Sequence, residues 1–381
     1  MDEFAELRQR LDIALDKEAA WPADSPWIRP AVDALPRHLF APDRVWVWDG
    51  SAYVPVDRAT DPGRWAELVY PSPDEATVTQ ITDGLATSSL SCQSVVVDML
   101  DSLMPEPGHR VLELGTGAGW NAALLAARTG PGQVTTVEVD PRLATGARTR
   151  LDAVGAGVSV VVGDGARGMA EDAPYDRVIA TYAVDEVPWS WVEQTRPGGR
   201  IVTPWGRLGH VALTVADDGC SASGWMQGLA MFMPSRGVGQ GLPWDRVRGD
   251  AAPETVGPFA GDVRRLHTDV SLLFAVRVVL PDVRIITRAR DGVTAWLHDG
   301  RSSWATLDAA ANGAAMAYQG GPRRLADETA RAWRKWERAG EPGLYDFGMT
   351  RTPDRQDIWS GDRDTGPRWT TTSRDPHPRS R

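Results

Sequence analysis

Three carboxylates lie at or near the ends of apolar segments, and two of them stand close to glycines. The first lies in the run Val111 to Trp120, VLELGTGAGW, in which Gly115, Gly117 and Gly119 follow the apolar residues. Glycine allows a tight turn and a close approach of the backbone to a ligand, and a helix that begins there offers unpaired N–H groups. Glu113 stands just before the turn, where its charge would repel a phosphate and attract an ammonium group. This turn therefore predicts a site for a cofactor that carries an ammonium group.

The other two carboxylates suit a nucleoside. Glu138 lies 23 residues after Gly115, at the end of the next apolar segment, where a carboxylate can accept hydrogen bonds from two ribose hydroxyls. Asp164 lies between Gly163 and Gly165 and can accept a hydrogen bond from an adenine amino group. The residues predicted to bind the cofactor are Glu113, Gly115, Thr116, Gly117, Gly119, Glu138, Val139, Gly163, Asp164 and Gly165.

Two phosphate-binding alternatives fit this turn less well. A dinucleotide site uses the spacing GxGxxG, whereas the turn here has GxGxG. A phosphate-binding loop needs a Gly-Lys-Ser/Thr sequence, and none follows. The alternative that remains is three ordinary strand-to-helix turns that are rich in glycine and acidic residues.

The elements that would position these residues alternate along the central third of the chain. Apolar segments of strand length alternate with alanine-rich segments of helix length, which is the pattern of a parallel sheet with crossover helices. The predicted strands are residues 110–114, 133–139, 158–163, 177–181 and 200–204, and the predicted helices are 120–129 and 143–154. We therefore expect an α/β fold with a doubly wound, mostly parallel sheet and the three acids near the ends of its first three strands.

Several segments of the sequence resemble the protein-L-isoaspartate O-methyltransferase family. They are residues 35–43 (LPRHLFAPD), 163–165 (GDG), 173–181 (APYDRVIAT), 186–188 (EVP) and 196–206 (RPGGRIVTPWG). The matches cover roughly residues 30–206. The resemblance implies a class I methyltransferase of Rossmann-like fold, with S-adenosylmethionine as the cofactor and S-adenosylhomocysteine as its product.

In that family a serine ahead of the cofactor strand holds the substrate carboxylate near the methyl group. The matching segment is 87–95, TSSLSCQSV, in which Ser91 fits best because the interval of 22 residues to Glu113 then matches. Ser89 is the second candidate for this catalytic role. The family usually has a proline two residues after its serine, whereas this sequence has Gln93, a departure that bears on the substrate geometry. A serine here can alternatively cap the helix that is expected to follow.

The resemblance leaves the second half of the chain to a separate part. The expected parts are a family-specific N-terminal extension (1–80), the methyltransferase domain (81–206), a C-terminal α+β accessory domain for substrate recognition (207–365) and a disordered tail (366–381). A hairpin over 283–297 and a helix over 322–339 are expected in the accessory domain. The eight tryptophans after residue 206 can form either a peptide-binding surface or a hydrophobic core.

Residues 207–381 have no counterpart in the compact repair enzymes of the family. Long relatives that act in ribosomal peptide biosynthesis, beside ATP-grasp ligases for graspetides or beside lanthipeptide enzymes, resemble this chain. The resemblance implies methylation of an aspartate side chain in a modified, macrocyclised precursor peptide. The next backbone nitrogen would then attack the ester and form an aspartimide. The alternative function is general repair of isoaspartyl residues in proteins.

The composition limits the partners and the compartment. A formal net charge of −10 argues against nucleic acid and anionic membranes as partners, because both would repel the chain. No apolar run is long enough for a membrane span and the N-terminus lacks the order of a signal peptide, so we expect a cytoplasmic protein. Two cysteines, Cys92 and Cys220, and six histidines without metal spacing predict neither a disulfide framework nor a metal site. The sequence leaves the oligomeric state open.

Overall fold

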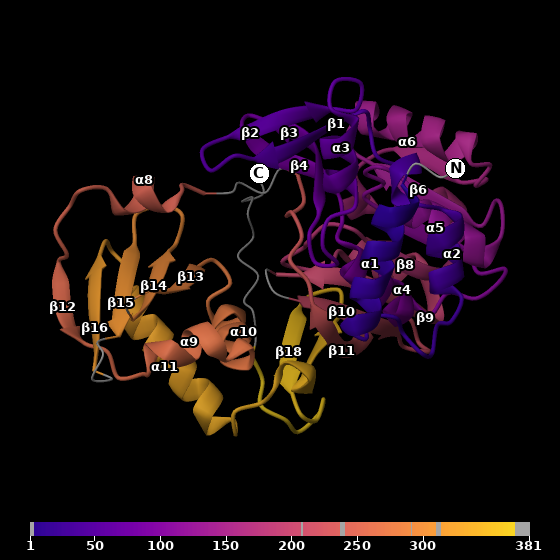
Figure 1. Cartoon of the computed structure of the whole chain (residues 1–381). Coiled ribbons are helices and arrows are strands. Elements are labelled where there is room, and N and C mark those ends of the chain that lie inside the picture. The colour runs from indigo at the N-terminus through magenta and orange to yellow at the C-terminus, as the bar shows by residue number, and fades with distance from the viewer. Residues whose placement is uncertain (1–3, 207–208, 237–240, 291, 310–313, 370–381) are drawn as a thin grey trace, which may run out of the picture. The chain divides into compact units, whose positions relative to one another are not determined.

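The computed structural model describes residues 4–206, 209–236, 241–290, 292–309 and 314–369. Over the central third of the chain, strands and helices alternate as predicted (Figure 1). The strands are β5 (Val111–Leu114), β6 (Val134–Glu138), β7 (Ser159–Val162), β8 (Tyr175–Ala180) and β9 (Thr195–Trp205). The helices are α4 (Gln93–Leu103), α5 (Trp120–Thr129), α6 (Pro141–Ala153) and α7 (Trp189–Glu193). All predicted strands and both predicted helices are confirmed, although β9 begins earlier than expected.

These strands form a doubly wound sheet that is parallel at its centre. The sheet has nine strands in the order β18-β17-β11-β10-β9-β8-β5-β6-β7, with β10 spanning Gly209–Val215, β11 spanning Ala222–Leu229, β17 spanning Phe347–Arg351 and β18 spanning Gln356–Ser360. β5 runs parallel to β6 and β8, and β10 runs antiparallel to β9. All four residues of β5 are buried, as expected of a strand that is covered on both faces. The sheet therefore continues beyond residue 206, where we expected the domain to end.

The chain divides into two compact units. The first contains the chain up to Trp205 together with Gly209–Ser223 and Gln227–Met233. The second contains Gly224–Met226 and the described residues from Pro234 onward. This division differs from the predicted one both at residue 206 and at residue 80, because the N-terminal residues belong to the first unit.

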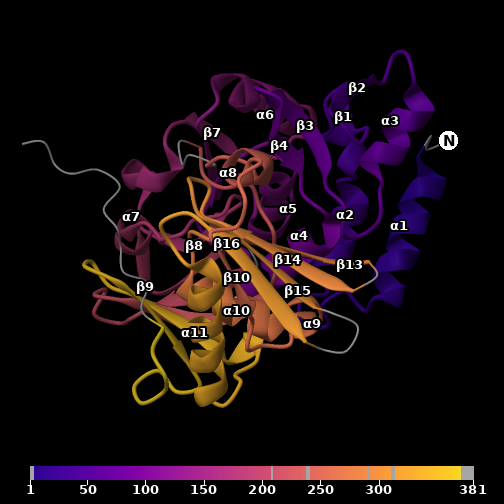
Figure 2. The same ribbon diagram turned by 90° about the vertical axis from the view of Figure 1, so that its left-hand side faces the viewer.

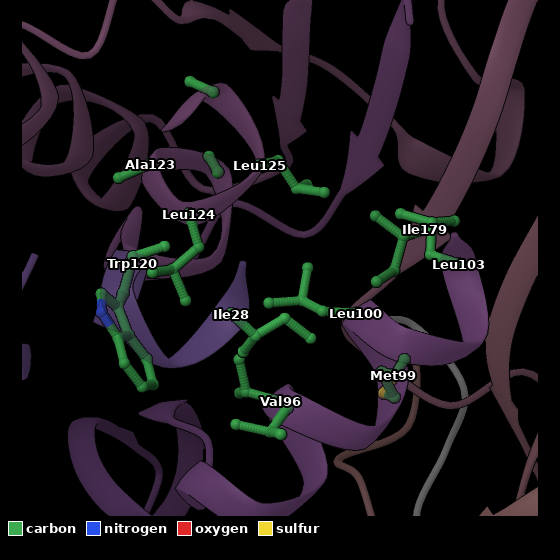
Figure 3. Close-up of a cluster of buried hydrophobic side chains, with 14 of the residues drawn as sticks. Ile28, Val96, Met99, Leu100, Leu103, Trp120, Ala123, Leu124, Leu125 and Ile179 are labelled. Carbon is green, nitrogen blue, oxygen red and sulfur yellow. The ribbon is translucent and has the colours of Figure 1, made fainter. Parts of the chain in front are cut away.

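The N-terminal residues form a layer of the first unit. Their elements are α1 (Ala5–Lys17), α2 (Ile28–Ala34), β1 (Arg44–Trp48), β2 (Tyr53–Asp57), α3 (Pro62–Val69), β3 (Thr77–Thr82) and β4 (Leu85–Leu90), and the strands form a sheet of order β2-β1-β3-β4. Figure 3 shows Ile28 of α2 among side chains of α4 and α5, including Leu100 and Leu124. All three are fully buried. The N-terminal segment therefore contributes to the hydrophobic core that α4, α5 and β5 share, and it does not form a separate domain.

The second unit is built on an antiparallel sheet of order β12-β16-β15-β14-β13. Its elements are α8 (Trp244–Arg248), β12 (Thr255–Pro258), α9 (Val263–Thr268), α10 (Val270–Val279), β13 (Arg284–Ala289), β14 (Val293–His298), β15 (Trp304–Ala309), β16 (Ala315–Gly320), α11 (Leu325–Arg338), β17 (Phe347–Arg351) and β18 (Gln356–Ser360). The predicted hairpin corresponds to β13 and β14, and the predicted helix corresponds to α11. Helices α9 and α11 pack against β14 and β15.

Most tryptophans of the second unit serve its core. Five of the eight after residue 206 are at most 4% exposed: Trp304, Trp333, Trp336, Trp359 and Trp369. Trp369 packs against Phe347 and its Nε1 donates to Ser360 Oγ at 3.1 Å. The chain is therefore packed up to residue 369, later than the start predicted for the tail, and the rest of that prediction lies outside the described residues. No helix in the described ranges is long and apolar enough to cross a membrane.

Candidate active site

The glycine turn lies at the middle of the sheet of the first unit. β5 ends at Leu114 between β6 and β8, and in doubly wound sheets ligands bind at the carboxyl ends of such central strands. The φ angles of Gly115, Gly117 and Gly119 are +95°, +52° and +93°, which favour glycine. A Cβ at Gly115 would also lie 2.5 Å from Thr181 Oγ1. The first glycine is therefore required for space as well as for backbone conformation.

Glu138 ends β6 beside this turn and is 6% exposed. Its Oε2 accepts the N–H of Gly117 at 2.9 Å, and its Oε1 accepts the N–H of Asp140 at 3.0 Å. A carboxylate has about four acceptor positions, so each oxygen keeps one for a ligand. Val139 follows directly and is 48% exposed. The structure therefore brings Glu138 to the glycine turn with acceptor capacity to spare and an apolar side chain next to it.

The turn that contains Asp164 borders the same edge of the sheet. The N–H of Gly163 donates to the carbonyl oxygen of Glu138 at 3.0 Å. Asp164 Oδ1 accepts the N–H of Ala166 at 3.0 Å, and the side chain remains 60% exposed. Its Oδ2 lies 4.0 Å from Arg167 Nε, beyond hydrogen-bond distance. Asp164 therefore presents one carboxylate oxygen to solvent close to Glu138.

Glu113 has a different place from the one predicted. It is fully buried, and its two carboxylate oxygens accept hydrogen bonds from Asn121 Nδ2 at 2.8 Å and from Thr136 Oγ1 at 2.5 Å. Burial raises the pKa of Glu113 to about 7, although these two hydrogen bonds act in the opposite direction. Thr116 is also buried and shares a 2.7 Å hydrogen bond with Thr136. A fully buried carboxylate is not accessible to a ligand. The contacts of Glu113 instead join the end of β5 to α5 and β6, next to the glycine turn.

Tyr182 belongs to the site and was missed by the sequence analysis. A Cβ added at Gly115 would lie 2.9 Å from its Cδ1, and one added at Gly165 would lie 2.5 Å from its Oη. Burial, with smaller contributions from the charges of Asp164 and Glu138, raises the pKa of Tyr182 well above its usual value. Its ring therefore lies between two of the predicted cofactor turns as a neutral phenol. Its position two residues after β8 is the signal that could have found it, because β8 neighbours β5.

The serine segment borders the glycine turn. A Cβ built at Gly117 would lie 3.8 Å from Ser88 Oγ and 3.8 Å from the carbonyl oxygen of Ser89. Ser91 lies between β4 and α4, and both Ser89 and Ser91 are half-buried. Helix α4 begins after Cys92, and no side chain caps it by a hydrogen bond, so the alternative role of a serine as its cap does not apply. The structure thus brings the segment to the site without choosing between Ser91 and Ser89.

A buried arginine holds the serine segment in place. Arg37 is 1% exposed, and its guanidinium donates to the carbonyl oxygens of Ser91 at 2.7 Å and Val69 at 3.0 Å. Its Cζ lies 4.9 Å from the ring centroid of Trp120, the first residue of α5. Burial lowers the pKa of Arg37 to about 10. A buried cation held by neutral groups is costly, so we interpret Arg37 as a residue that positions the serine segment against α5.

Comparisons with known proteins identify the family. The family model described as Protein-L-isoaspartate(D-aspartate) O-methyltransferase (PCMT) matches residues 58–231. The protein-L-isoaspartate O-methyltransferase 2 of Archaeoglobus fulgidus is 31% identical over 240 residues, which are 62% of this chain and 95% of that protein. This chain belongs to the protein-L-isoaspartate O-methyltransferase family. Members of the family are S-adenosylmethionine-dependent carboxyl O-methyltransferases.

Other family members match a shorter region. The protein-L-isoaspartate O-methyltransferase of Methanopyrus kandleri is 45% identical over 121 residues, 31% of this chain and 54% of that enzyme. The enzyme of Staphylothermus marinus is 46% identical over 126 residues, 31% of this chain and 56% of its own length. The chain thus spans about half the length of these two relatives.

One solved protein-L-isoaspartate O-methyltransferase has a similar fold. It has a TM-score of 0.53 at 21% identity and covers 93% of this chain and 100% of its own. The likeness of fold therefore extends over both units.

Proposed function

We propose that this protein transfers the methyl group of S-adenosylmethionine to the isoaspartyl carboxylate of polypeptides. The observation that carries the proposal is the proximity of the serine segment to the glycine turn, where a Cβ built at Gly117 would lie 3.8 Å from Ser88 Oγ and 3.8 Å from the carbonyl oxygen of Ser89. Family membership supplies the reaction class, and this proximity supports a role for the serine segment in holding the acceptor near the cofactor.

The residues at the turn fit the cofactor. Glu138 has unused acceptor positions for two ribose hydroxyls, and Asp164 has an exposed oxygen for the adenine amino group. The exposed side chain of Val139 offers an apolar surface for the flat base. The three glycines allow the backbone to approach the amino-acid end. When bound, the cofactor supplies an electrophilic sulfonium methyl group.

The chain's own residues have an alignment task. A side-chain carboxyl with an ordinary pKa of about 3.9 is already an anion at neutral pH, so the reaction needs no general base. Ser91, with Ser89 as the alternative, would donate a hydrogen bond to the acceptor carboxylate. Arg37 holds the backbone of Ser91 and thereby limits its motion. Correct alignment of two reacting groups can supply about 7 to 11 kcal/mol of the barrier.

A second candidate function is methylation of an aspartate in a macrocyclised precursor peptide, followed by aspartimide formation. The observation in its favour is the departure from the family at Gln93, where the family has proline. Gln93 opens α4, is 5% exposed and lies two residues from Ser91, so it shapes the acceptor side of the site. The presence of Gln93 in place of proline supports an acceptor different from that of the usual repair enzymes.

Mass spectrometry with three acceptors separates the two candidates. The acceptors are an isoaspartyl peptide, its aspartyl counterpart, and a macrocyclised precursor with one aspartate. The proposed function predicts that the isoaspartyl peptide alone gains the mass of a methyl ester. Methylation of the cyclised precursor followed by loss of methanol, with the isoaspartyl peptide unchanged, would replace it with the tailoring function.

The cofactor assignment has its own test. Glu138→Ala removes the predicted acceptor of the ribose hydroxyls, and hydrogen bonds to charged groups are worth about 1.5 to 3 kcal/mol each. We expect S-adenosylhomocysteine to bind at least tenfold more weakly by calorimetry. Glu171→Ala, which removes an exposed carboxylate outside the turns, is the matched control and should not change the affinity. Unchanged affinity in folded Glu138→Ala protein would exclude Glu138 from the site.

A further inference from the structure

The two faces of the five-stranded sheet in the second unit differ in character. Side chains that point to the helices are buried, and Ala295, Leu297, Ala305, Leu307 and Ala317 are at most 7% exposed. The side chains between them point to the opposite face, because successive residues of a strand alternate. A half-buried antiparallel sheet usually carries polar residues on that outer face.

The outer face instead carries a row of mostly apolar and aromatic side chains. Strand register places Ile286 opposite Trp296, Trp296 opposite Thr306, Thr306 opposite Tyr318, and Tyr318 opposite Val256. Ile286 and Val256 are 55% and 53% exposed, and the three side chains between them are half-buried. Strands β13 to β16 lie side by side in Figure 2. With about 4.8 Å between neighbouring strands, the row is about 19 Å long, the span of about six extended residues.

A hollow interrupts the row between β15 and β16. It has a volume of about 200 Å³ and is lined by Arg248, Pro253, Trp304, Thr306, Asp308 and Tyr318. The Cζ of Arg248 lies 3.9 Å from the ring centroid of Trp304, so the guanidinium covers the indole at the edge of the hollow. Thr306 and Tyr318 belong to both the row and the hollow. The hollow can therefore accept one side chain of a ligand that lies along the row.

The charge of the outer face is mostly positive. Arg284 and Arg288 flank Ile286 on β13, and Arg248 lines the hollow. None of these three forms an ion pair with a carboxylate in the described ranges. By contrast, other arginines of the unit are paired: Arg264 with Asp262, Arg265 with Asp269 and Glu341, Arg323 with Asp282 and Glu328, and Arg324 with Glu254. Asp308 adds one negative charge in the hollow.

We propose that this outer face binds an extended, acidic segment of the polypeptide that the first unit methylates. Apolar side chains of the segment would pack on the row and in the hollow, and its carboxylates would pair with Arg248, Arg284 and Arg288. The identity of the polypeptide as the methylation substrate rests on the proposed function, whereas binding of an acidic segment does not. When the segment is bound, the acceptor residue that is linked to it is present at a higher effective concentration. Binding at this face should therefore lower KM for the polypeptide.

The surface favours this occupant over two others. If the same face met itself, a second copy of the chain would bring three arginines that have no carboxylate partner in the described ranges against the same three, and like charges repel. A nucleic acid could pair with the arginines, but its phosphate backbone carries no apolar side chain for the row or the hollow, and its dense negative charge would lie against Asp308. An acidic peptide supplies both the carboxylates and the side chains that the row and the hollow accept.

Binding is tested on the full chain with a labelled peptide that alternates glutamate with phenylalanine or valine. Fluorescence anisotropy should show binding that weakens with salt, and at least tenfold weaker binding for Arg288→Glu and for Trp296→Ala. Arg331→Glu makes the same charge change on an exposed residue of α11, away from the sheet face, and should bind as the unchanged protein does. Equal weakening by Arg288→Glu and Arg331→Glu would overturn the proposal, as would equal binding of a peptide with lysine in place of glutamate.

Kinetics separate this inference from the proposed function. Isoaspartyl peptides are made with and without the acidic segment, joined by flexible Gly/Ser linkers of several lengths. The segment should lower KM at least tenfold at the best linker length, and Arg288→Glu should abolish that gain while leaving kcat for the short peptide unchanged. A segment that leaves KM unchanged at every linker length would overturn the inference.

Other outcomes separate the two proposals. No methylation of either peptide, with anisotropy still showing the specific binding, would overturn only the proposed function. Stronger binding of a single-stranded oligonucleotide, or dimerisation that Arg288→Glu disrupts, would replace the peptide as the occupant.

Discussion

Three carboxylates near the ends of neighbouring strands differ in burial, and on that ground we propose different roles for them. Glu113 is fully buried and bonded on both oxygens, Glu138 is 6% exposed with acceptor positions unused, and Asp164 is exposed. The sequence places all three acids at or near the end of a predicted strand, so their positions along the chain do not distinguish them. The burial of each side chain depends on how α5 and the neighbouring strand pack against it. We therefore propose that the buried Glu113 is structural and that Glu138 and Asp164, which have acceptor positions left, bind the ligand.

The burial of Glu113 makes the stability of the protein depend on pH. Its pKa is about 7 in the folded chain and 4.5 in the unfolded chain, so between these values the unfolded state loses its proton first. The free energy of unfolding should therefore fall as pH rises from 4.5 to 7, by about 3 kcal/mol from this group. Glu113→Gln keeps the shape but not the titration, and should flatten this part of the profile in denaturant unfolding. An unchanged slope would show that Glu113 is ionised in the folded protein.

Tyr182 and Gly165 depend on each other. A Cβ at Gly165 would lie 2.5 Å from Tyr182 Oη but 3.3 Å from Cζ, so removing the hydroxyl relieves the closest contact. Gly165→Ala should therefore destabilise the protein by about 1 to 3 kcal/mol, the usual cost of overpacking. In a Tyr182→Phe background the same substitution should cost much less in thermal unfolding. Additive effects of the two changes would mean that Tyr182 does not lie against Gly165.

At the scale of elements, the strands that support the site were predictable and the contacts between distant elements were not. β5, β6 and β8 are rich in apolar and β-branched residues because they lie inside the sheet, and a glycine or proline lies close to at least one end of each. Strands β10 and β11 were missed because the alternation of strands and helices ends after β9 and both pair locally as antiparallel strands. The bond from Arg37 to Ser91 joins residues 54 positions apart, and no local pattern records such a contact.

The contacts at the junction of β4 and α4 make Ser91 our first candidate for the serine that orients the acceptor, and a pair of variants tests the choice. Ser91 sits at the junction and its carbonyl is held by Arg37, whereas Ser89 lies within β4 opposite Val78. A held backbone limits the motion of the side chain, so Ser91→Ala should lower methyl transfer by a factor on the order of 10 to 1000 with cofactor affinity nearly unchanged. Ser89→Ala is the matched control and should do less. A damaging Ser89→Ala with a silent Ser91→Ala would move the role to Ser89.

At the scale of the whole molecule, we propose that the two units carry different tasks. The turns that fit the cofactor all belong to the first unit, and the outer sheet face proposed to bind an acidic segment belongs to the second. The sheet β2-β1-β3-β4 and the parallel strands around β5 belong to the first unit, whereas the five-stranded antiparallel sheet belongs to the second. A chain organised in this way can keep one cofactor site while its choice of polypeptide changes through the second unit.

If the two units open independently, a bound cofactor should slow hydrogen exchange in the first unit only. Ligand at 100 times its Kd stabilises the state that binds it by about 2.7 kcal/mol, which slows exchange through unfolding of that state about a hundredfold. Hydrogen exchange of the full chain with S-adenosylhomocysteine should therefore slow in β5, β6 and β8 and in the turns after them. Strands β13 to β16 should exchange as before, because compact units usually open independently. Glu138→Ala at the same ligand concentration is the control and should lose the slowing in the first unit. Equal slowing in both units would show instead that they unfold as one cooperative body, so that a change in the second unit could not leave the cofactor site unaffected.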